Sequence, residues 1–231
     1  MIHVGVLGST GRMGREVLRV LKEEFSAHAE IAAQPKHGED LSVLNSCDVI
    51  IDFALPEAVM SFIKQASGNF PTLIVCSTGW TLDQRKELEV YSKKAPVLMS
   101  SNFSLGFQAV LEILKTAGPL LDKLGYSPVI VETHHKYKKD APSGTAISLQ
   151  RAASPLAPGN VQIQSVRAGE VIGDHEITFY GAGDHITLGH FAQDRSIFAR
   201  GAIQCATWLA GKRSQITGFV PIENYLKDYL K

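Results

Sequence analysis

The stretch Ile2-His-Val-Gly-Val-Leu-Gly8-Ser-Thr-Gly11-Arg-Met-Gly14 decides the fold of this chain. An apolar run over residues 2–7 is typical of a buried strand, and apolar residues recur at helical spacing over residues 12–24. Gly8 allows a tight turn, Gly11 lets the backbone approach a pyrophosphate, and Gly14 allows close packing of helix on strand. We therefore predict a dinucleotide-binding turn; the alternative is a glycine-rich turn without a ligand.

The first hundred residues continue this alternation of strands and helices. Four further apolar runs predict strands, at residues 31–33, 49–53, 72–76 and 97–100. Helical spacing covers residues 56–66, where Pro56 suits a first helical turn, and residues 82–94. This order is typical of a doubly wound parallel sheet. We predict an α/β protein with an N-terminal Rossmann dinucleotide-binding domain over residues 1–104.

The pattern changes after Asn102. Helices are predicted at residues 105–124, 143–153 and 196–209, and strands at residues 129–133, 161–167, 176–180 and 185–188. Alternation in the last three strands indicates an antiparallel or mixed sheet with one covered face, and we predict a mixed sheet. Residues 152–159 form the most loop-like stretch. We expect an α+β C-terminal domain over residues 105–206, with the tail 207–231 returning to the first domain.

Composition excludes several classes of partner. The chain has 231 residues, of which 45% are hydrophobic, and its 23 Lys and Arg balance 23 Asp and Glu. Without a net positive field, and without an apolar run near the ~20 residues that span a bilayer, we expect no nucleic acid and no membrane. Cys47, Cys76 and Cys205 are widely spaced and form no CxxC pair. A reducing, cytoplasmic location is therefore expected.

The residues after the second predicted strand bear on the choice of dinucleotide. Sites that prefer NAD usually have an Asp or Glu there, which binds the ribose hydroxyls. The stretch Ala33-Gln-Pro-Lys-His37 contains no carboxylate. Lys36, His37 and Arg12 could instead meet a 2′-phosphate, which favours NADPH or weak discrimination between NADPH and NADH. The alternative is that Lys36 and His37 form only a solvated loop.

The segment Glu132-Thr-His-His-Lys-Tyr-Lys-Lys-Asp-Ala-Pro-Ser-Gly-Thr-Ala146 runs from a strand end to a helix start. Ser143 is the expected N-cap, so Ser143-Gly144-Thr145 would present backbone N–H groups to a carboxylate or phosphate. Side chains that can hold a second anion or deliver a proton precede this helix: His134, His135 and Lys138. We expect a small dianionic substrate between the two.

The same segment allows other interpretations. A metal site at His134 and His135 is not expected, because adjacent strand residues point to opposite faces and no carboxylate or cysteine stands at a clear ligand spacing. Lys136 and Lys139 are expected to be solvated. Asp140 could steady the loop, orient a base, or belong to a plain turn.

Several blocks together resemble one family. They are GSTGRMG at residues 8–14, Asp52-Phe53, Ser77-Thr78-Gly79, Ser101-Asn102-Phe103-Ser104 and, most specifically, the segment from His134 to Ala146. Their order and spacing resemble 4-hydroxy-tetrahydrodipicolinate reductases, also called dihydrodipicolinate reductases, of the diaminopimelate route to lysine. The resemblance implies reduction of 4-hydroxy-tetrahydrodipicolinate, via dihydrodipicolinate, to tetrahydrodipicolinate with NADPH or NADH.

The resemblance also implies roles for individual residues. His134 would be a proton donor or acceptor and Lys138 a proton donor, while His135, Gly144 and Thr145, beside Ser143, would bind the substrate carboxylates. The cofactor would contact Gly8, Ser9, Thr10, Gly11, Arg12, Met13, Lys36, Phe53, Cys76, Ser77, Thr78, Ser100, Ser101, Asn102 and Phe103. The family is usually tetrameric through the sheet of the second domain, which implies a homotetramer.

Three features depart from the family pattern. The acidic residue that many relatives carry in the cofactor loop is missing, Cys76 stands where relatives often have glycine, and the stretch from Gln34 to Cys47 is short. Two rival functions were considered, a Rossmann oxidoreductase related to aspartate or sugar dehydrogenases and a nucleotide-sensing module without activity. The His134–Ala146 segment argues against both.

Overall fold

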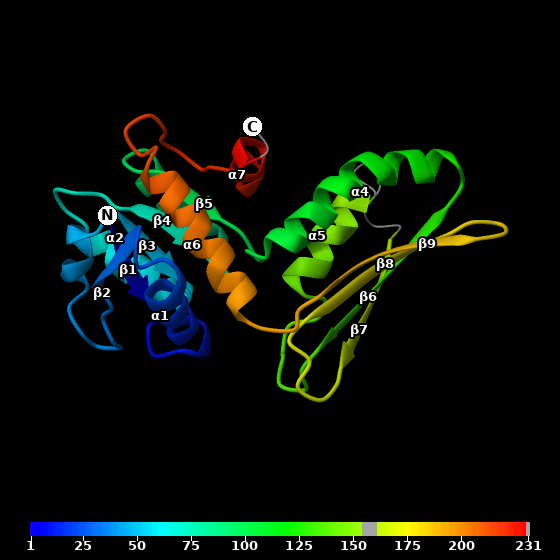
Figure 1. The fold of residues 1–231 in the computed structure, drawn as a ribbon, viewed down its shortest axis with the longest axis horizontal. Helices are drawn as coiled ribbons and strands as arrows, with labels where there is room; N and C mark the ends of the chain where they lie inside the picture. Colours follow the sequence, from blue (N-terminus) through cyan, green and yellow to red (C-terminus); the bar gives the residue numbers. More distant parts are fainter. Residues whose placement is uncertain (154–160, 230–231) are drawn as a thin grey trace. The chain divides into compact units, whose positions relative to one another are not determined.

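The computed structural model describes residues 1–153 and 161–229, which form two compact units (Figure 1). Unit 1 comprises Met1–Phe103 and Ser196–Lys231, and unit 2 comprises Ser104–Arg195. The chain returns to unit 1 at Ser196, earlier than residue 207, because α6 (Ser196–Ala210) packs on α1 (Arg12–Glu24) and on two strands of the unit 1 sheet. Most of the loop-like stretch 152–159 lies outside the described residues.

Unit 1 is built on five parallel strands in the order β2-β1-β3-β4-β5. The strands are β1 (Ile2–Leu7), β2 (Ala29–Ala33), β3 (Val49–Asp52), β4 (Thr72–Val75) and β5 (Val97–Met99). Every residue of β3 and β4 is buried, as expected for central parallel strands with helices on both faces. The strand order changes direction at β1, which makes the carboxyl ends of β1 and β3 the switch point where such sheets bind ligands.

Helices cover both faces of this sheet (Figure 1). Besides α1 and α6 they are α2 (Pro56–Gln65), α3 (Leu82–Ser92) and the 3-10 helix η1 (Leu41–Ser46). Pro56 opens α2 as predicted, and a capping box between Thr81 and Gln84 starts α3. The α/β prediction is confirmed, although η1 and α7 (Ile222–Tyr229) were missed. The short helix α7 depends on tertiary packing, since the ring of Tyr225 lies 5.7 Å from that of Trp208.

Unit 2 is a mixed sheet in the order β7-β6-β8-β9, with helices over one face (Figure 1). Its elements are α4 (Leu105–Lys123), β6 (Ser127–His134), α5 (Gly144–Ala153), β7 (Gln162–Arg167), β8 (Asp174–Tyr180) and β9 (His185–Phe191). β6 runs parallel to β7 and antiparallel to β8. Ile130 and Ile177 form the core with Phe107 and Leu149. The prediction of a mixed sheet with one covered face is confirmed.

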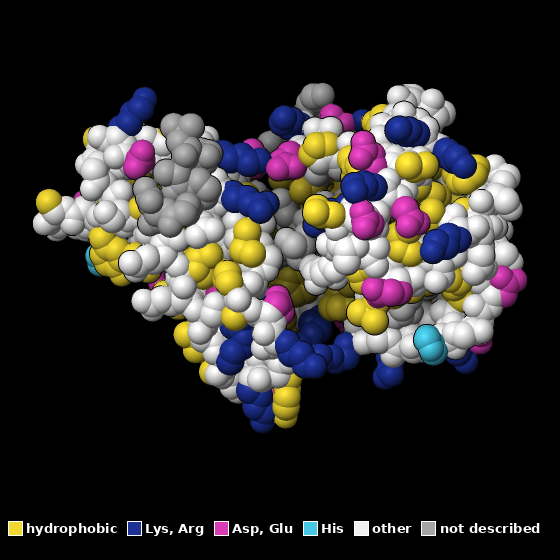
Figure 2. Space-filling view, turned by 180° about the vertical axis from the view of Figure 1, so that it is seen from behind, with side chains coloured by type: hydrophobic (Ala, Val, Ile, Leu, Met, Phe, Trp, Pro, Cys, Tyr) yellow, Lys and Arg dark blue, Asp and Glu magenta, His cyan; other side chains and the backbone are white. Residues whose placement is uncertain are grey.

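The surface agrees with the balanced composition. On the face of unit 1 in Figure 2, lysine and arginine side chains are interspersed with aspartate and glutamate side chains. Among the described residues, every helix is too short or too polar to cross a lipid bilayer.

Candidate active site

A cavity of about 640 Å³ opens in unit 1 at the ends of β1 and β3. Its lining includes Gly8, Thr10 and Gly11 of the glycine turn, Lys36 after β2 and Phe53 after β3. All five were predicted to bind the cofactor. The cavity lies at the switch point of the sheet, and its volume is in the range of small-molecule and cofactor sites.

The glycine turn presents backbone to this cavity. Gly8 has a φ of +85°, and a Cβ at Gly8 would lie 2.8 Å from the backbone of Phe53 and Ala54. A Cβ at Gly14 would lie 2.0 Å from the carbonyl oxygen of Gly8. Gly11 is the N-cap of α1 and supplies no capping side chain. The start of α1 therefore fits a pyrophosphate, which needs N–H groups and close backbone approach.

The remaining residues of the turn have different environments. The Ser9 hydroxyl is buried and lies 3.2 Å from each of the carbonyl oxygens of Gln34 and Pro35, to which it can donate, so this side chain anchors the loop after β2. Arg12 is exposed at the start of α1, and Met13 is half-buried. The hydroxyl of Ser9 is thus engaged by the loop after β2.

The loop after β2 brings a carboxylate to the cavity that the sequence analysis missed. Glu39 lines the same cavity as Lys36, and its Oε2 accepts a hydrogen bond of 2.8 Å from the Lys36 backbone N–H. The loop turns back at Gly38, which has a φ of +85°. A basic and an acidic residue thus both line the cavity where the ribose of a dinucleotide would be recognised. The glycine was the only signal of this turn in the sequence.

The residues predicted at the nicotinamide end follow two other strands. Cys76, Ser77 and Thr78 come after β4, and Ser100 to Phe103 come after β5, so both groups lie at the carboxyl edge of the parallel sheet. The hydroxyl of Ser77 donates to the buried carboxylate of Asp52 at 2.5 Å. Burial raises the pKa of Asp52 to about 6, against the hydrogen bonds from Ser77 and Ala54. Asp52 thereby fastens the end of β4 to the end of β3.

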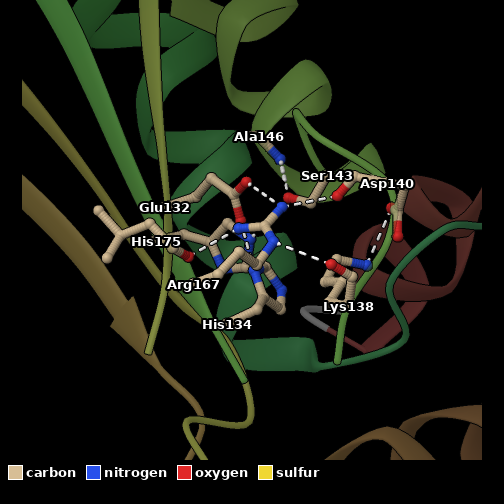
Figure 3. Close-up of polar contacts among 9 residues, drawn as sticks. Glu132, His134, Lys138, Asp140, Ser143, Ala146, Arg167 and His175 are labelled. Atoms are coloured by element: carbon tan, nitrogen blue, oxygen red, sulfur yellow. Dashed lines mark hydrogen bonds and ion pairs between the residues drawn. The ribbon is translucent and has the colours of Figure 1, made fainter. Parts of the chain in front are cut away.

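In unit 2, the predicted catalytic residues belong to a cluster of charged and polar side chains (Figure 3). Glu132 and His134 are two residues apart on β6, so their side chains share the covered face of the sheet, and both are buried. Nδ1 of His134 is hydrogen-bonded to Oε2 of Glu132. Pairing across the sheet places Arg167 opposite His134 and His175 opposite Glu132.

Arg167 connects this strand to the loop that carries Lys138. Its guanidinium donates to Oε1 of Glu132 at 2.9 Å, to the carbonyl oxygen of Asp140 at 2.6 Å and to that of Lys138 at 3.3 Å. Nζ of Lys138 forms an ion pair of 2.9 Å with Asp140. His135 is the first residue of this loop after β6, and its ring lies 6.2 Å from that of Tyr137.

The start of α5 lies on the other side of the cluster. Ser143 Oγ accepts a hydrogen bond of 3.1 Å from the N–H of Ala146, which makes Ser143 the predicted N-cap. Gly144 and Thr145 are the first residues of the helix. Ser143 Oγ also lies 3.1 Å from Nε2 of His175, whose ring packs edge-on against His134 with centroids 4.9 Å apart. Unit 2 therefore brings His134, Lys138 and the helix start together.

Burial and neighbouring charges set the protonation of the cluster. Burial lowers the pKa of His134, and the charges of Lys138 and Arg167 lower it further, against the carboxylate of Glu132. Burial also lowers the pKa of His175, to about 3. Burial alone would raise the pKa of Glu132, but hydrogen bonds led by that from Arg167 hold it below its usual value. At neutral pH both histidines are therefore neutral and Glu132 is ionised.

A possible metal-ligand set lies in the same cluster. Donor atoms of Glu132, His134 and His175 lie within 4.8 Å of one another. The adjacent pair His134 and His135 did not predict this set, because its third member, His175, comes from β8. Both carboxylate oxygens of Glu132 are already bound, one by Arg167 and one by His134. The guanidinium occupies the place of a cation, so we assign no step to a metal.

The chain matches two family descriptions that together span both units. "Dihydrodipicolinate reductase, N-terminus" covers residues 2–103, and "Dihydrodipicolinate reductase, C-terminus" covers residues 106–226. Two relatives are named 4-hydroxy-tetrahydrodipicolinate reductase. That of Rickettsia bellii is 35% identical over 99% of this chain and 97% of its own length. That of Bdellovibrio bacteriovorus is 36% identical over 92% of each chain.

Solved structures support the fold. A dipicolinate-bound dihydrodipicolinate reductase from Paenisporosarcina sp. TG-14 is similar over 97% of this chain and 99% of its own, with a TM-score of 0.76 and 22% identity. A probable dehydrogenase from Thermotoga maritima is similar over 99% of this chain and 94% of its own, with a TM-score of 0.60 and 11% identity.

Two glycine substitutions separate ligand binding from folding. In Gly11→Ala the nearest atom to the new Cβ is 3.3 Å away, so unit 1 should fold, but a methyl group would stand where the pyrophosphate approaches. We expect dinucleotide affinity to fall by about tenfold or more. In Gly14→Ala the clash with Gly8 should lower the free energy of unfolding by roughly 2 kcal/mol. Calorimetric binding and denaturant unfolding test both; normal affinity in Gly11→Ala would contradict the phosphate assignment.

The buried neutral state of His175 predicts a pH dependence of stability. Its pKa is about 3 in the folded protein, below the ~6.5 of an unfolded histidine. Between these values the unfolded chain binds more protons, so stability falls as the pH falls below 6.5. From pH 7.5 to pH 5 the wild type should lose about 1–2 kcal/mol more than His175→Gln. Denaturant unfolding measures this difference, and His28→Gln, at an exposed histidine, should match the wild type.

Proposed function

The chain belongs to the dihydrodipicolinate reductase family, and from this premise we propose that unit 1 binds a pyridine nucleotide and unit 2 the substrate. The chain is an oxidoreductase that reduces 4-hydroxy-tetrahydrodipicolinate, the activity for which its relatives are named. Both family descriptions match, and the buried His134 and the half-buried Lys138 lie in one cluster with the start of α5. That juxtaposition carries the assignment of the site residues.

The substrate is a small dicarboxylate, and unit 2 offers two places for its carboxylates. The start of α5 at Gly144 and Thr145 supplies N–H groups and the positive end of a helix dipole. His135 and Lys138 lie on the preceding loop and supply donors. A ring held at both carboxylates has one fixed orientation, which is what a directed hydride transfer requires.

Reduction adds a hydride to one carbon of the imine-containing ring system and a proton to its neighbour. A pyridine nucleotide held by unit 1 would supply the hydride. We assign the proton to the ammonium group of Lys138, which Asp140 holds at 2.9 Å, because the lowered pKa of His134 leaves that imidazole neutral. The neutral His134 can then accept a proton at Nε2. A bound dianion would favour the charged form of each group.

Both NADPH and NADH are proposed as cofactors. Lys36 suits the 2′-phosphate of NADPH, and Glu39 in the same loop suits the ribose hydroxyls of NADH. We further propose a homotetramer formed through the uncovered face of the unit 2 sheet, where Val131, Thr178 and Phe191 lie, as the family resemblance implies. A cytoplasmic location remains a prediction from the sequence.

An assay coupled to an enzyme that forms 4-hydroxy-tetrahydrodipicolinate tests reaction and cofactor together. Loss of NADPH and of NADH absorbance is followed separately after this substrate is formed. Lys36→Ala should raise the KM for NADPH by roughly tenfold and leave the KM for NADH nearly unchanged, whereas Glu39→Gln should do the reverse. Failure of the wild type to oxidise either nucleotide would contradict the proposed function.

Substitution of the two proton-handling side chains tests the site. Lys138→Ala and His134→Ala should each lower turnover by on the order of 10²-fold while the dissociation constant of the nucleotide is unchanged. Lys139→Ala, at the exposed neighbouring lysine, is the matched control and should turn over normally. Near-normal turnover in both Lys138→Ala and His134→Ala would show that the assignment is wrong.

A further inference from the structure

Glu132 has no place in the proposed chemistry, yet it is completely buried beside His134. Oε2 is hydrogen-bonded to Nδ1 of His134, and Oε1 accepts from Nη2 of Arg167 at 2.9 Å. A buried carboxylate costs several kcal/mol of desolvation, and replacing such a pair by apolar side chains is often neutral or stabilising. Stability is therefore a weak explanation for a carboxylate at this place.

The carboxylate decides which nitrogen of His134 carries the proton. An ionised carboxylate can only accept hydrogen bonds, so Nδ1 of the neutral imidazole must donate to it. Nε2 is then the one ring atom whose protonation can change. Gly173 borders this atom, since a Cβ there would lie 3.1 Å from Nε2. The glycine leaves space beside the nitrogen that is free to react.

Arg167 also fixes the position of the loop that carries Lys138. Its guanidinium binds Glu132 and also the carbonyl oxygens of Lys138 and Asp140, at 3.3 and 2.6 Å (Figure 3). One planar donor group thus fixes the carboxylate that orients His134 and the backbone that carries Lys138. A lysine in place of Arg167 would keep the charge but lose this fork of donors.

We infer that Glu132 and Arg167 are positioning residues of the reaction: Glu132 holds His134 as the Nδ1–H tautomer with Nε2 toward the reactants, and Arg167 locks Glu132 to the Lys138 loop. The inference rests on the proposed function for its catalytic meaning. The tautomer itself is a property of the ligand-free protein. The charged and titratable groups that face His134 are Glu132 on β6, Arg167 on β7, His175 on β8, and Lys138 and Asp140 on the loop.

The tautomer is measured directly in the wild type. Nitrogen-15 NMR of histidine-labelled protein at pH 7.5, with His134→Gln to assign the signal, should show a protonated Nδ1 and an unprotonated Nε2 for His134. A protonated Nε2 would overturn the inference whether or not the enzyme is active. This measurement needs no folded variant at Glu132, and it stands apart from the assay that tests the proposed function.

Turnover measurements then test whether the contacts of Glu132 and Arg167 matter for the reaction. Glu132→Gln keeps the shape but can donate to Nδ1, so we expect loss of the Nδ1–H signal and a fall in kcat by about 10²-fold, with nucleotide affinity unchanged. Glu132→Asp keeps an acceptor and should recover part of the rate. Arg167→Lys should lower kcat while the Nδ1–H tautomer persists. Glu170→Gln, at an exposed carboxylate, is the control.

The outcomes separate the two proposals. If His134→Ala loses turnover but Glu132→Gln keeps both the tautomer and the rate, the positioning role is wrong and the proposed function stands. If the wild type fails to reduce the substrate, the proposed function is wrong, and the NMR result still decides the tautomer. Should Glu132→Gln unfold, Arg167→Lys and the wild-type tautomer decide the inference.

Discussion

A buried carboxylate with both oxygens bound governs the arrangement of unit 2. Glu132 is an ionised group inside a sheet, and a charge in such a place persists only with partners at each oxygen. The partners come from its own strand, two residues on, and from the neighbouring strand β7. Because Arg167 also reaches the carbonyl oxygens of the following loop, the position of that loop depends on the same charge. The same contacts that stabilise the buried charge of Glu132 therefore also position His134 and the loop that carries Lys138.

In unit 1 the proposed nucleotide site is formed by backbone groups rather than by a buried charge. Gly8 lets the β1–α1 turn approach the end of β3 more closely than any side chain permits, and Gly14 lets α1 pack equally closely on Gly8 and Ser9 of the turn. The start of α1 then supplies N–H groups without a capping side chain. A buried acid again stands at the end of a central strand, since Asp52 accepts from Ser77 and from the N–H of Ala54. Here the carboxylate joins the ends of two strands.

In the loop after β2, an acidic residue at another position lines the cavity in place of the one that the family pattern has. The acidic residue is missing from its usual place, but the turn at Gly38 returns Glu39 to the cavity beside Lys36. In the proposed site, Lys36 would suit a ribose that bears a phosphate and Glu39 one that bears free hydroxyls. Discrimination between the two nucleotides would then follow from the path of this loop, and pyrophosphate binding from the glycine turn.

The sequence by itself determined what is local: the glycine turn, the strand and helix order, the N-cap at Ser143 and the segment from His134 to Ala146. Each follows from the spacing of neighbouring residues, and Glu132 could have been recognised too, since alternation places it on the face of His134. Tertiary structure alone decided the rest. Arg167 and His175 reach β6 through strand register over more than thirty residues, and Glu39 reaches the cavity through a turn at positive φ. No local pattern encodes either contact, because register is set by the packing of the whole sheet.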